Sequence, residues 1–190
     1  MRWRRELTRG ADVSTTEIRP ATAGDAAAID AVVDAGFASY SVWAPSGWQA
    51  PGEHASGWAA LADGASPADR AWVAVTAGDH SVAGVAGVAR TALRSKAIPH
   101  APGGAVILRN LFVARAWWGT GVADALLAHA LTAARDDGYG AVWLATPAGA
   151  VQARRFYERS GFTERSQHDD RPLGLRLVVY ARGTHERAST

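Results

Sequence analysis

The sequence predicts an α/β domain in which a mixed β-sheet carries helices on both faces. Apolar segments of strand length alternate along the chain with segments of helical periodicity, which is the pattern of such a layered fold. Of the 190 residues, 48% are hydrophobic, enough to build a core. No internal repeat or low-complexity linker divides the chain after residue 20, so one ordinary domain is expected.

The expected elements follow in the order strand, helix, three strands, helix, strand, helix and two strands. The first helix is marked by the capping-box pattern of Thr22 and Asp25, followed by an apolar stripe at helical spacing. The expected strands are Thr16 to Pro20, Ala71 to Thr76, Val82 to Leu93, Val106 to Val113, Ala141 to Thr146, a short strand after Phe162, and Leu175 to Ala181. The first expected helix runs from about Gly24 to Phe37, the second begins after Gly121, and the third contains Tyr157.

Several glycines refine this outline. Gly84 and Gly87, inside one predicted strand, indicate a bulge or a close approach of another backbone. Gly138 and Gly161 are placed to end the second and third helices. His129 falls between apolar positions of the second helix and is expected to be structural or exposed.

The segment from Arg115 to Leu127 joins a predicted strand to a predicted helix and contains two close glycines, Gly119 and Gly121. Glycine at such a junction lets backbone N–H groups approach an anion, and the helix start adds about half a positive charge. A ligand with phosphate groups is therefore expected. A dinucleotide fingerprint would need glycine at Asp124, and the Gly-Lys-Ser/Thr ending of a Walker A loop is absent. For the glycine pair alone, an ordinary tight turn is the alternative.

The six residues from Trp118 to Ala123 resemble the acetyl-CoA signature of the GCN5-related N-acetyltransferase (GNAT) family: Gln or Arg, any two residues, Gly, any residue, then Gly or Ala. Trp118 replaces Gln or Arg, but the backbone amides from Gly119 onward supply donors whatever side chain stands there. The resemblance implies that acetyl-CoA is the cosubstrate. The residues implied to bind it are Leu111, Phe112, Val113, Trp118, Gly119, Thr120, Gly121, Val122, Ala123 and Ala153.

A second segment, from Ala150 to Phe162, resembles the Asn-x-x-Ala-x-x-x-Tyr-Glu-x-x-Gly-Phe segment of the same family, with Ala150 in place of Asn. Tyr157 is expected to point inward, since it shares a helical face with Ala153. The resemblance implies that Tyr157 lies beside the coenzyme sulfur and acts as a general acid that protonates the leaving thiolate. From the residues alone, a core tyrosine with a solvated hydroxyl is the alternative.

The resemblance also implies a mostly antiparallel sheet of six or seven strands, in which Leu111 to Val113 and Ala141 to Thr146 splay apart around the pantetheine arm. A backbone N–H near Val113 is implied to stabilise the oxyanion of the tetrahedral intermediate, a contribution of about 3 kcal/mol for one donor. The implied reaction is direct attack on acetyl-CoA by a primary amine of a small molecule. Two alternatives stay open: a non-catalytic acyl-CoA binding or sensing domain, and a protein or peptide N-acetyltransferase.

The base that deprotonates the amine is not assigned, because Arg109 and Asn110 stand where relatives often have a carboxylate. Other candidates, each weighed against a solvated loop residue, are Glu53, His54, His100, His168, Asp169 and Asp170. The segment after the first helix is aromatic, and either lines a slot for a flat or apolar amine, with Glu53 attracting its charge, or packs on the sheet. Its aromatic residues are Phe37, Tyr40, Trp43, Trp48 and Trp58.

Composition limits the remaining possibilities. The chain has no cysteine, which excludes disulfides, thiolate zinc sites and a cysteine nucleophile, and no metal ion is expected. A net charge of +2 gives no argument for nucleic acid, and no apolar run approaches the roughly 20 residues of a membrane span. We therefore expect a cytoplasmic monomer or homodimer that acts on a small molecule, without a nucleic-acid or membrane partner. The expected organisation is a disordered basic extension (1–14), a GNAT domain (15–183) and a flexible tail (184–190).

Overall fold

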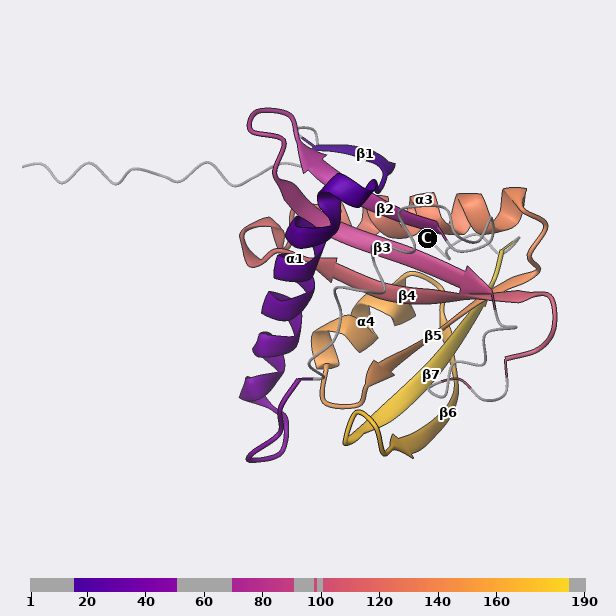
Figure 1. Cartoon of the computed structure of the whole chain (residues 1–190). Helices are drawn as coiled ribbons and strands as arrows, with labels where there is room; N and C mark the ends of the chain where they lie inside the picture. The colour runs from indigo at the N-terminus through magenta and orange to yellow at the C-terminus, as the bar shows by residue number, and fades with distance from the viewer. Residues whose placement is uncertain (1–15, 51–69, 91–97, 99–100, 185–190) are drawn as a thin grey trace, which may run out of the picture.

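The computed structural model describes residues 16–50, 70–90, 98 and 101–184, which form a seven-stranded sheet with three α-helices (Figure 1). The strand order is β1-β2-β3-β4-β5-β7-β6, and neighbouring strands are antiparallel except for β4 and β5, which run parallel. The predicted mixed, mostly antiparallel sheet is confirmed. Its elements are β1 Thr16–Pro20, α1 Ala26–Ala38, β2 Arg70–Thr76, β3 Val82–Arg90, β4 Ala105–Val113, α3 Val122–Asp136, β5 Ala141–Pro147, α4 Val151–Arg159, β6 Thr163–Asp170 and β7 Leu175–Gly183.

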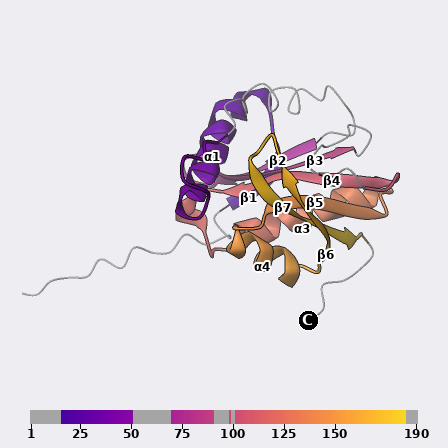
Figure 2. The same ribbon diagram turned by 90° about the horizontal axis from the view of Figure 1, so that it is seen from below.

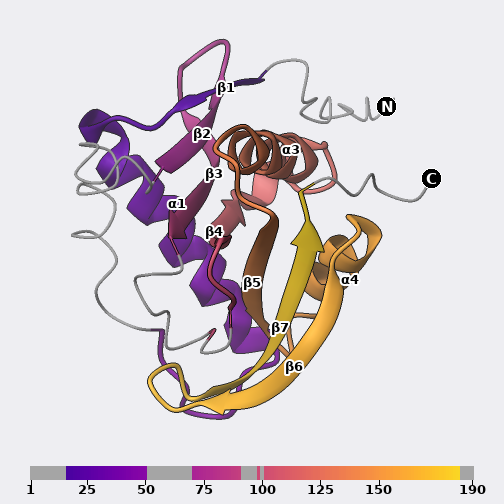
Figure 3. The ribbon, with the colours of Figure 1, turned by 90° about the vertical axis from the view of Figure 1, so that its right-hand side faces the viewer.

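Helices cover both faces of the sheet, as predicted (Figures 2 and 3). Helix α1 packs on one face, mainly against β3 and β4, and α3 and α4 pack on the other. Successive strand residues point to opposite faces, so the apolar strands supply both cores. The core under α1 includes Ile29, Val33, Phe37, Val73 and Val85, and the core under α3 and α4 includes Leu126, Val142, Leu144, Tyr157 and Val178.

Asp25 fixes the start of α1. Its carboxylate accepts hydrogen bonds from the backbone N–H of Thr22 at 2.7 Å and from the Thr22 hydroxyl at 2.8 Å. Two N–H groups of Arg19 donate to the same carboxylate, each at 2.8 Å. These bonds, chiefly those from Arg19, hold the pKa of Asp25 well below its usual range. The predicted capping box is confirmed, but a 3-10 turn over Ala23–Asp25 precedes the α-helix, which begins at Ala26.

The glycines predicted to end helices do so. Gly138 and Gly161 have φ values of +80° and +82°, just beyond α3 and α4. The predicted close approach at Gly84 is also present, because a Cβ there would lie 3.0 Å from the Phe112 carbonyl oxygen and 3.0 Å from Leu126 Cδ1. Gly84 therefore lets β4 and α3 pack against β3.

One strand is longer in the structure than predicted, and another runs up to the limit of the described residues. β3 is described over Val82–Arg90, and residues 91–93, predicted to extend it, lie outside the described part of the chain. The strand after Phe162 is not short but runs for eight residues, Thr163–Asp170, at the edge of the sheet. The predicted extension, 1–14, and residues 185–190 of the predicted tail also lie outside the described residues. Among the helices that are described, none is long and apolar enough to cross a membrane.

Candidate active site between β4 and β5

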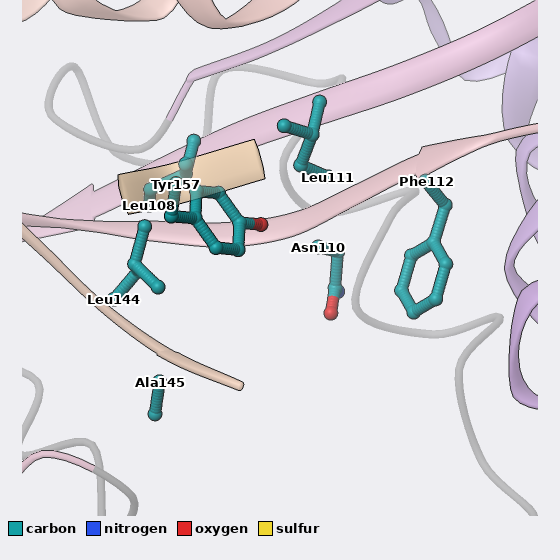
Figure 4. A pocket seen from close by; sticks show the side chains of 7 residues that line it. All are labelled: Leu108, Asn110, Leu111, Phe112, Leu144, Ala145 and Tyr157. Carbon is teal, nitrogen blue, oxygen red and sulfur yellow. The ribbon is translucent and has the colours of Figure 1, made fainter. Parts of the chain in front are cut away.

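β4 and β5 separate after three paired residues. Ala105–Ile107 pair with Ala141–Trp143, after which both strands continue without pairing to each other (Figure 1). The splay of the central strands is therefore present, and a pocket lies within it (Figure 4). Three elements line this pocket: β4 with Leu108, Asn110, Leu111 and Phe112, β5 with Leu144 and Ala145, and α4 with Tyr157.

β4 bulges where it lines the pocket. Asn110 and Leu111 together stand opposite Ala86 of β3, between two ordinary cross-strand pairs. Asn110 has a φ of +49°, in the left-handed region that asparagine tolerates better than most residues. A bulge of this kind turns backbone groups out of the ladder. The irregular pairing of β3 that Gly84 and Gly87 predicted is confirmed. The sequence did not show, however, which strand carries the extra residue, and in the structure this strand is β4.

Tyr157 reaches the pocket from α4 and is 8% exposed. Its ring packs edge-on against Phe156 and Phe162, with centroid distances of 5.3 Å and 5.7 Å. Figure 4 shows its hydroxyl oxygen directed toward the side of the pocket where Asn110 lies. Burial raises the pKa of the Tyr157 phenol above its usual value, and the nearby Tyr40 contributes to the same shift. The hydroxyl therefore stays protonated at neutral pH and is a hydrogen-bond donor within the pocket.

The predicted phosphate loop has the backbone that anion binding requires. Gly119 and Gly121 have φ values of +75° and +91°, and Gly121 is the N-cap of α3, with no side-chain cap hydrogen bond. The first N–H groups of a helix have no partner within it, and left-handed residues beside them turn further amides toward the same concavity. The hydroxyl of Thr120 points back to the Trp117 carbonyl oxygen, at 2.7 Å. This backbone conformation is of the kind that binds phosphate and other anions at the start of a helix.

The other residues implied to contact the coenzyme occupy different positions. Leu111 and Phe112 line the pocket, whereas Val113 is the last residue of β4. Ala153 is partly buried and packs against the core instead of lining the pocket. Ala150, which replaces the family's Asn, is 8% exposed at the start of α4.

Aromatic rings cluster after α1. Tyr40 lies between Trp43 and Trp48, at centroid distances of 4.6 Å and 5.8 Å. Phe37 contacts both Tyr40, at 5.4 Å, and the pocket residue Phe112, at 5.2 Å. Burial raises the pKa of Tyr40 to about 12. The cluster therefore reaches the pocket wall through Phe112, whereas Tyr40 itself does not line the pocket.

The two described tryptophans of this cluster, Trp43 and Trp48, pack the chain that follows α1 against two loops that are distant in the sequence. The Trp43 ring lies against Gly149, between β5 and α4. The Trp48 indole N–H donates to the Leu173 carbonyl oxygen, between β6 and β7, at 2.8 Å. Packing is thus one role of these residues. Trp58, predicted with them, lies outside the described residues.

None of the general-base candidates that the structure describes lines the pocket. Outside the described residues lie Glu53, His54 and His100. The cluster 168–170 belongs to β6 instead of a loop, and does not line the pocket. Asp169 accepts a hydrogen bond from Arg176 at 3.4 Å, and Asp170 accepts one from the Leu173 N–H at 2.7 Å. The seven described lining residues include no carboxylate or imidazole, and no group of three or more possible metal ligands occurs in the described part of the chain.

His129 is exposed on α3, as predicted, with its ring 5.4 Å from that of Trp72.

Comparison with known proteins identifies the family. The model described as "Acetyltransferase (GNAT) family" matches residues 35–162, and the chain belongs to the GNAT acetyltransferase family. No curated protein matched the chain in a sequence search.

Solved structures agree with this assignment at the level of the fold. A protein described as an acetyltransferase of the GNAT family from Desulfovibrio desulfuricans is 23% identical, with a TM-score of 0.67 over 89% of this chain and 99% of its own. An acetyltransferase from Salmonella typhimurium, solved with its cofactor acetyl-CoA, is 19% identical, with a TM-score of 0.67 over 92% and 97%. A ribosomal-protein-alanine N-acetyltransferase from Brucella melitensis is 19% identical, with a TM-score of 0.66 over 88% and 99%.

Proposed function

We propose that this protein transfers an acetyl group from acetyl-CoA to a primary amine of a small molecule by direct attack. The observation that carries the proposal is the Tyr157 hydroxyl in the pocket between the separated strands β4 and β5. β4 leads from this pocket to the loop at Gly119 and Gly121. A ligand with a reactive thioester at one end and phosphates at the other can lie along this path.

In the proposed reaction, the amine nitrogen attacks the thioester carbonyl carbon and a C–N bond forms. We assign the stabilisation of the oxyanion to backbone N–H groups of β4 between the bulge at Asn110 and Val113. The C–S bond then breaks, the thiolate takes a proton from Tyr157, and the nitrogen, now bonded to the acetyl carbon, gives its surplus proton to the phenolate oxygen. The raised pKa of Tyr157 keeps the proton on the phenol until negative charge develops on sulfur, when the hydrogen bond from the hydroxyl to sulfur leads to proton transfer.

The ring cluster after α1 supports a flat or apolar amine as the acceptor. Phe112 lines the pocket and connects it to the cluster through Phe37. Aromatic faces also attract a cationic amine before it loses its proton. No described pocket residue accepts that proton, so we propose that it leaves through water.

Two alternative functions have specific support. Trp118, Ala150 and the lack of a carboxylate among the described pocket residues favour a non-catalytic acyl-CoA sensing domain. A protein or peptide acceptor is the second alternative, supported by the structural similarity to the Brucella melitensis protein, which is described as a ribosomal-protein-alanine N-acetyltransferase.

The decisive experiment measures free-thiol release from acetyl-CoA by the purified chain. The acceptors are amino acids, polyamines, aromatic amines, aminoglycosides and short peptides, and acetyl-CoA binding is measured in the same preparation. Turnover with flat aromatic amines supports the proposal, and turnover with peptides alone replaces the small-molecule acceptor. Binding without turnover across the panel favours sensing, and a failure to bind acetyl-CoA overturns the proposed cosubstrate.

A further inference from the structure

Trp118 presents an unusual surface beside the phosphate loop. It is 47% exposed, one of three large hydrophobic residues that stand out as exposed among those described. It directly precedes Gly119, the first left-handed glycine of the loop. Exposed aromatic surface of this size is stabilised when a flat apolar group covers it.

The indole of Trp118 is held in a defined orientation. Its N–H donates to the Val113 carbonyl oxygen at 2.7 Å, which ties the side chain to the end of β4. This bond uses the only polar atom of the indole. The surface that remains exposed is therefore carbon, and it suits stacking better than a further hydrogen bond.

A positive charge lies over one face of this ring and leaves the other face to a ligand. The Arg115 guanidinium carbon is above the Trp118 ring, 6.0 Å from its centroid. Arg115 is exposed and forms no salt bridge with any other described residue. A planar apolar face next to an unpaired cation matches a ligand that carries both a purine ring and a phosphate.

We propose that Trp118 and Arg115 bind the nucleotide end of coenzyme A, with the indole stacked on adenine and the guanidinium beside the ribose 3′-phosphate. This inference rests on the proposed function, which makes acetyl-CoA the ligand of the adjacent loop. The indole replaces the phosphate contact of the family's Gln or Arg by a contact with the base. Removing such a base–aromatic stack lowers affinity by roughly 5-fold to 100-fold.

The test is isothermal titration calorimetry with acetyl-CoA, acetyl-dephospho-CoA and S-acetyl-4′-phosphopantetheine, which lacks the nucleoside. We expect Trp118→Ala to weaken acetyl-CoA binding by roughly tenfold or more and to leave the binding of the truncated thioester unchanged. Trp118→Phe keeps an aromatic face but loses the N–H, so it should retain most of the affinity. Arg115→Gln should weaken acetyl-CoA but not acetyl-dephospho-CoA.

Other outcomes overturn the inference in distinguishable ways. Equal losses with acetyl-CoA and the truncated thioester would mean that Trp118 acts through the loop or the pantetheine arm. Unchanged acetyl-CoA affinity in a Trp118→Ala variant that unfolds at the wild-type temperature would exclude the stack and leave the proposed function intact. If the wild-type chain binds no acetyl-CoA, both proposals fail together.

Discussion

Trp43 lies so close to Gly149 that a Cβ on Gly149 would be 2.2 Å from Trp43 Cε3. This contact fixes the aromatic segment against the connection between β5 and α4. We expect Gly149→Ala to displace the indole, lower the free energy of unfolding by about 1–3 kcal/mol, and raise the acceptor KM while leaving acetyl-CoA affinity unchanged. Denaturant unfolding, calorimetry and steady-state kinetics measure the three quantities. An unaltered acceptor KM would restrict the aromatic segment to a packing role.

Tyr157→Phe should reduce the acetyl-transfer kcat by about 100-fold or more, as expected for loss of a general acid. The hydroxyl makes no hydrogen bond to another described residue, so unfolding and acetyl-CoA binding should barely change. Tyr180→Phe is the matched control, because its hydroxyl bonds to Glu158 and Arg154 outside the pocket lining. That variant should lose stability and keep its kcat. Undiminished turnover of Tyr157→Phe would remove the acid role.

Gly119→Ala tests the anion-binding loop. Its φ of +75° imposes strain of about 1–2 kcal/mol on alanine, although no described residue other than its chain neighbours has an atom within 4 Å of the added methyl group. We expect the loop to shift and acetyl-CoA affinity to fall by roughly tenfold. Gly78→Ala, also in open space but without a left-handed φ, is the control and should bind normally. Equal affinity in both variants would argue against the loop as the phosphate site.

The pH dependence of transfer should follow the acceptor. Burial raises the pKa of Tyr157 above its usual value and that of Tyr40 to about 12, so both hydroxyls stay protonated below about pH 10. The value of kcat/KM should therefore rise with pH as the ammonium group loses its proton, up to the pKa of the amine. For two acceptors of different pKa, the plots of kcat/KM against pH should be shifted along the pH axis by the difference between the two amine pKa values. If kcat/KM instead rises over the same pH range for both acceptors, the titrating group belongs to the enzyme and lies outside the described pocket residues.

Asp25→Asn should destabilise the domain by about 1–3 kcal/mol at pH 7, because hydrogen bonds to a carboxylate are stronger than those to an amide. The folded pKa of Asp25 is lowered, so its stabilisation is present above the unfolded value of about 3.9 and is lost as pH falls below it. The difference between wild type and variant should therefore shrink below about pH 4. Asp34→Asn, at an exposed position of α1, is the control, and urea unfolding at several pH values measures both.

The sequence predicted the order of the elements and most of their bounds, because hydrophobic spacing and glycines reflect local geometry. It described β6 poorly, since an exposed edge strand such as Thr163–Asp170 has no apolar face to reveal it. The left-handed φ of Asn110 also gave no signal, because this residue lies in an otherwise regular strand pattern and the bulge depends on pairing with β3. Likewise, the anchoring of Trp118 on Val113 depends on the path of the loop between them.

The parallel contact of only Ala105–Ile107 with Ala141–Trp143 divides the sheet into two hydrogen-bonded units, β1 to β4 and β5 to β7. Beyond this junction, a bound ligand would take the place of a missing strand between β4 and β5. Substrate binding would then complete the sheet as well as fill a pocket. Amide hydrogen exchange along Leu108–Val113 would then slow on binding, because amides of the ligand would pair with this part of β4.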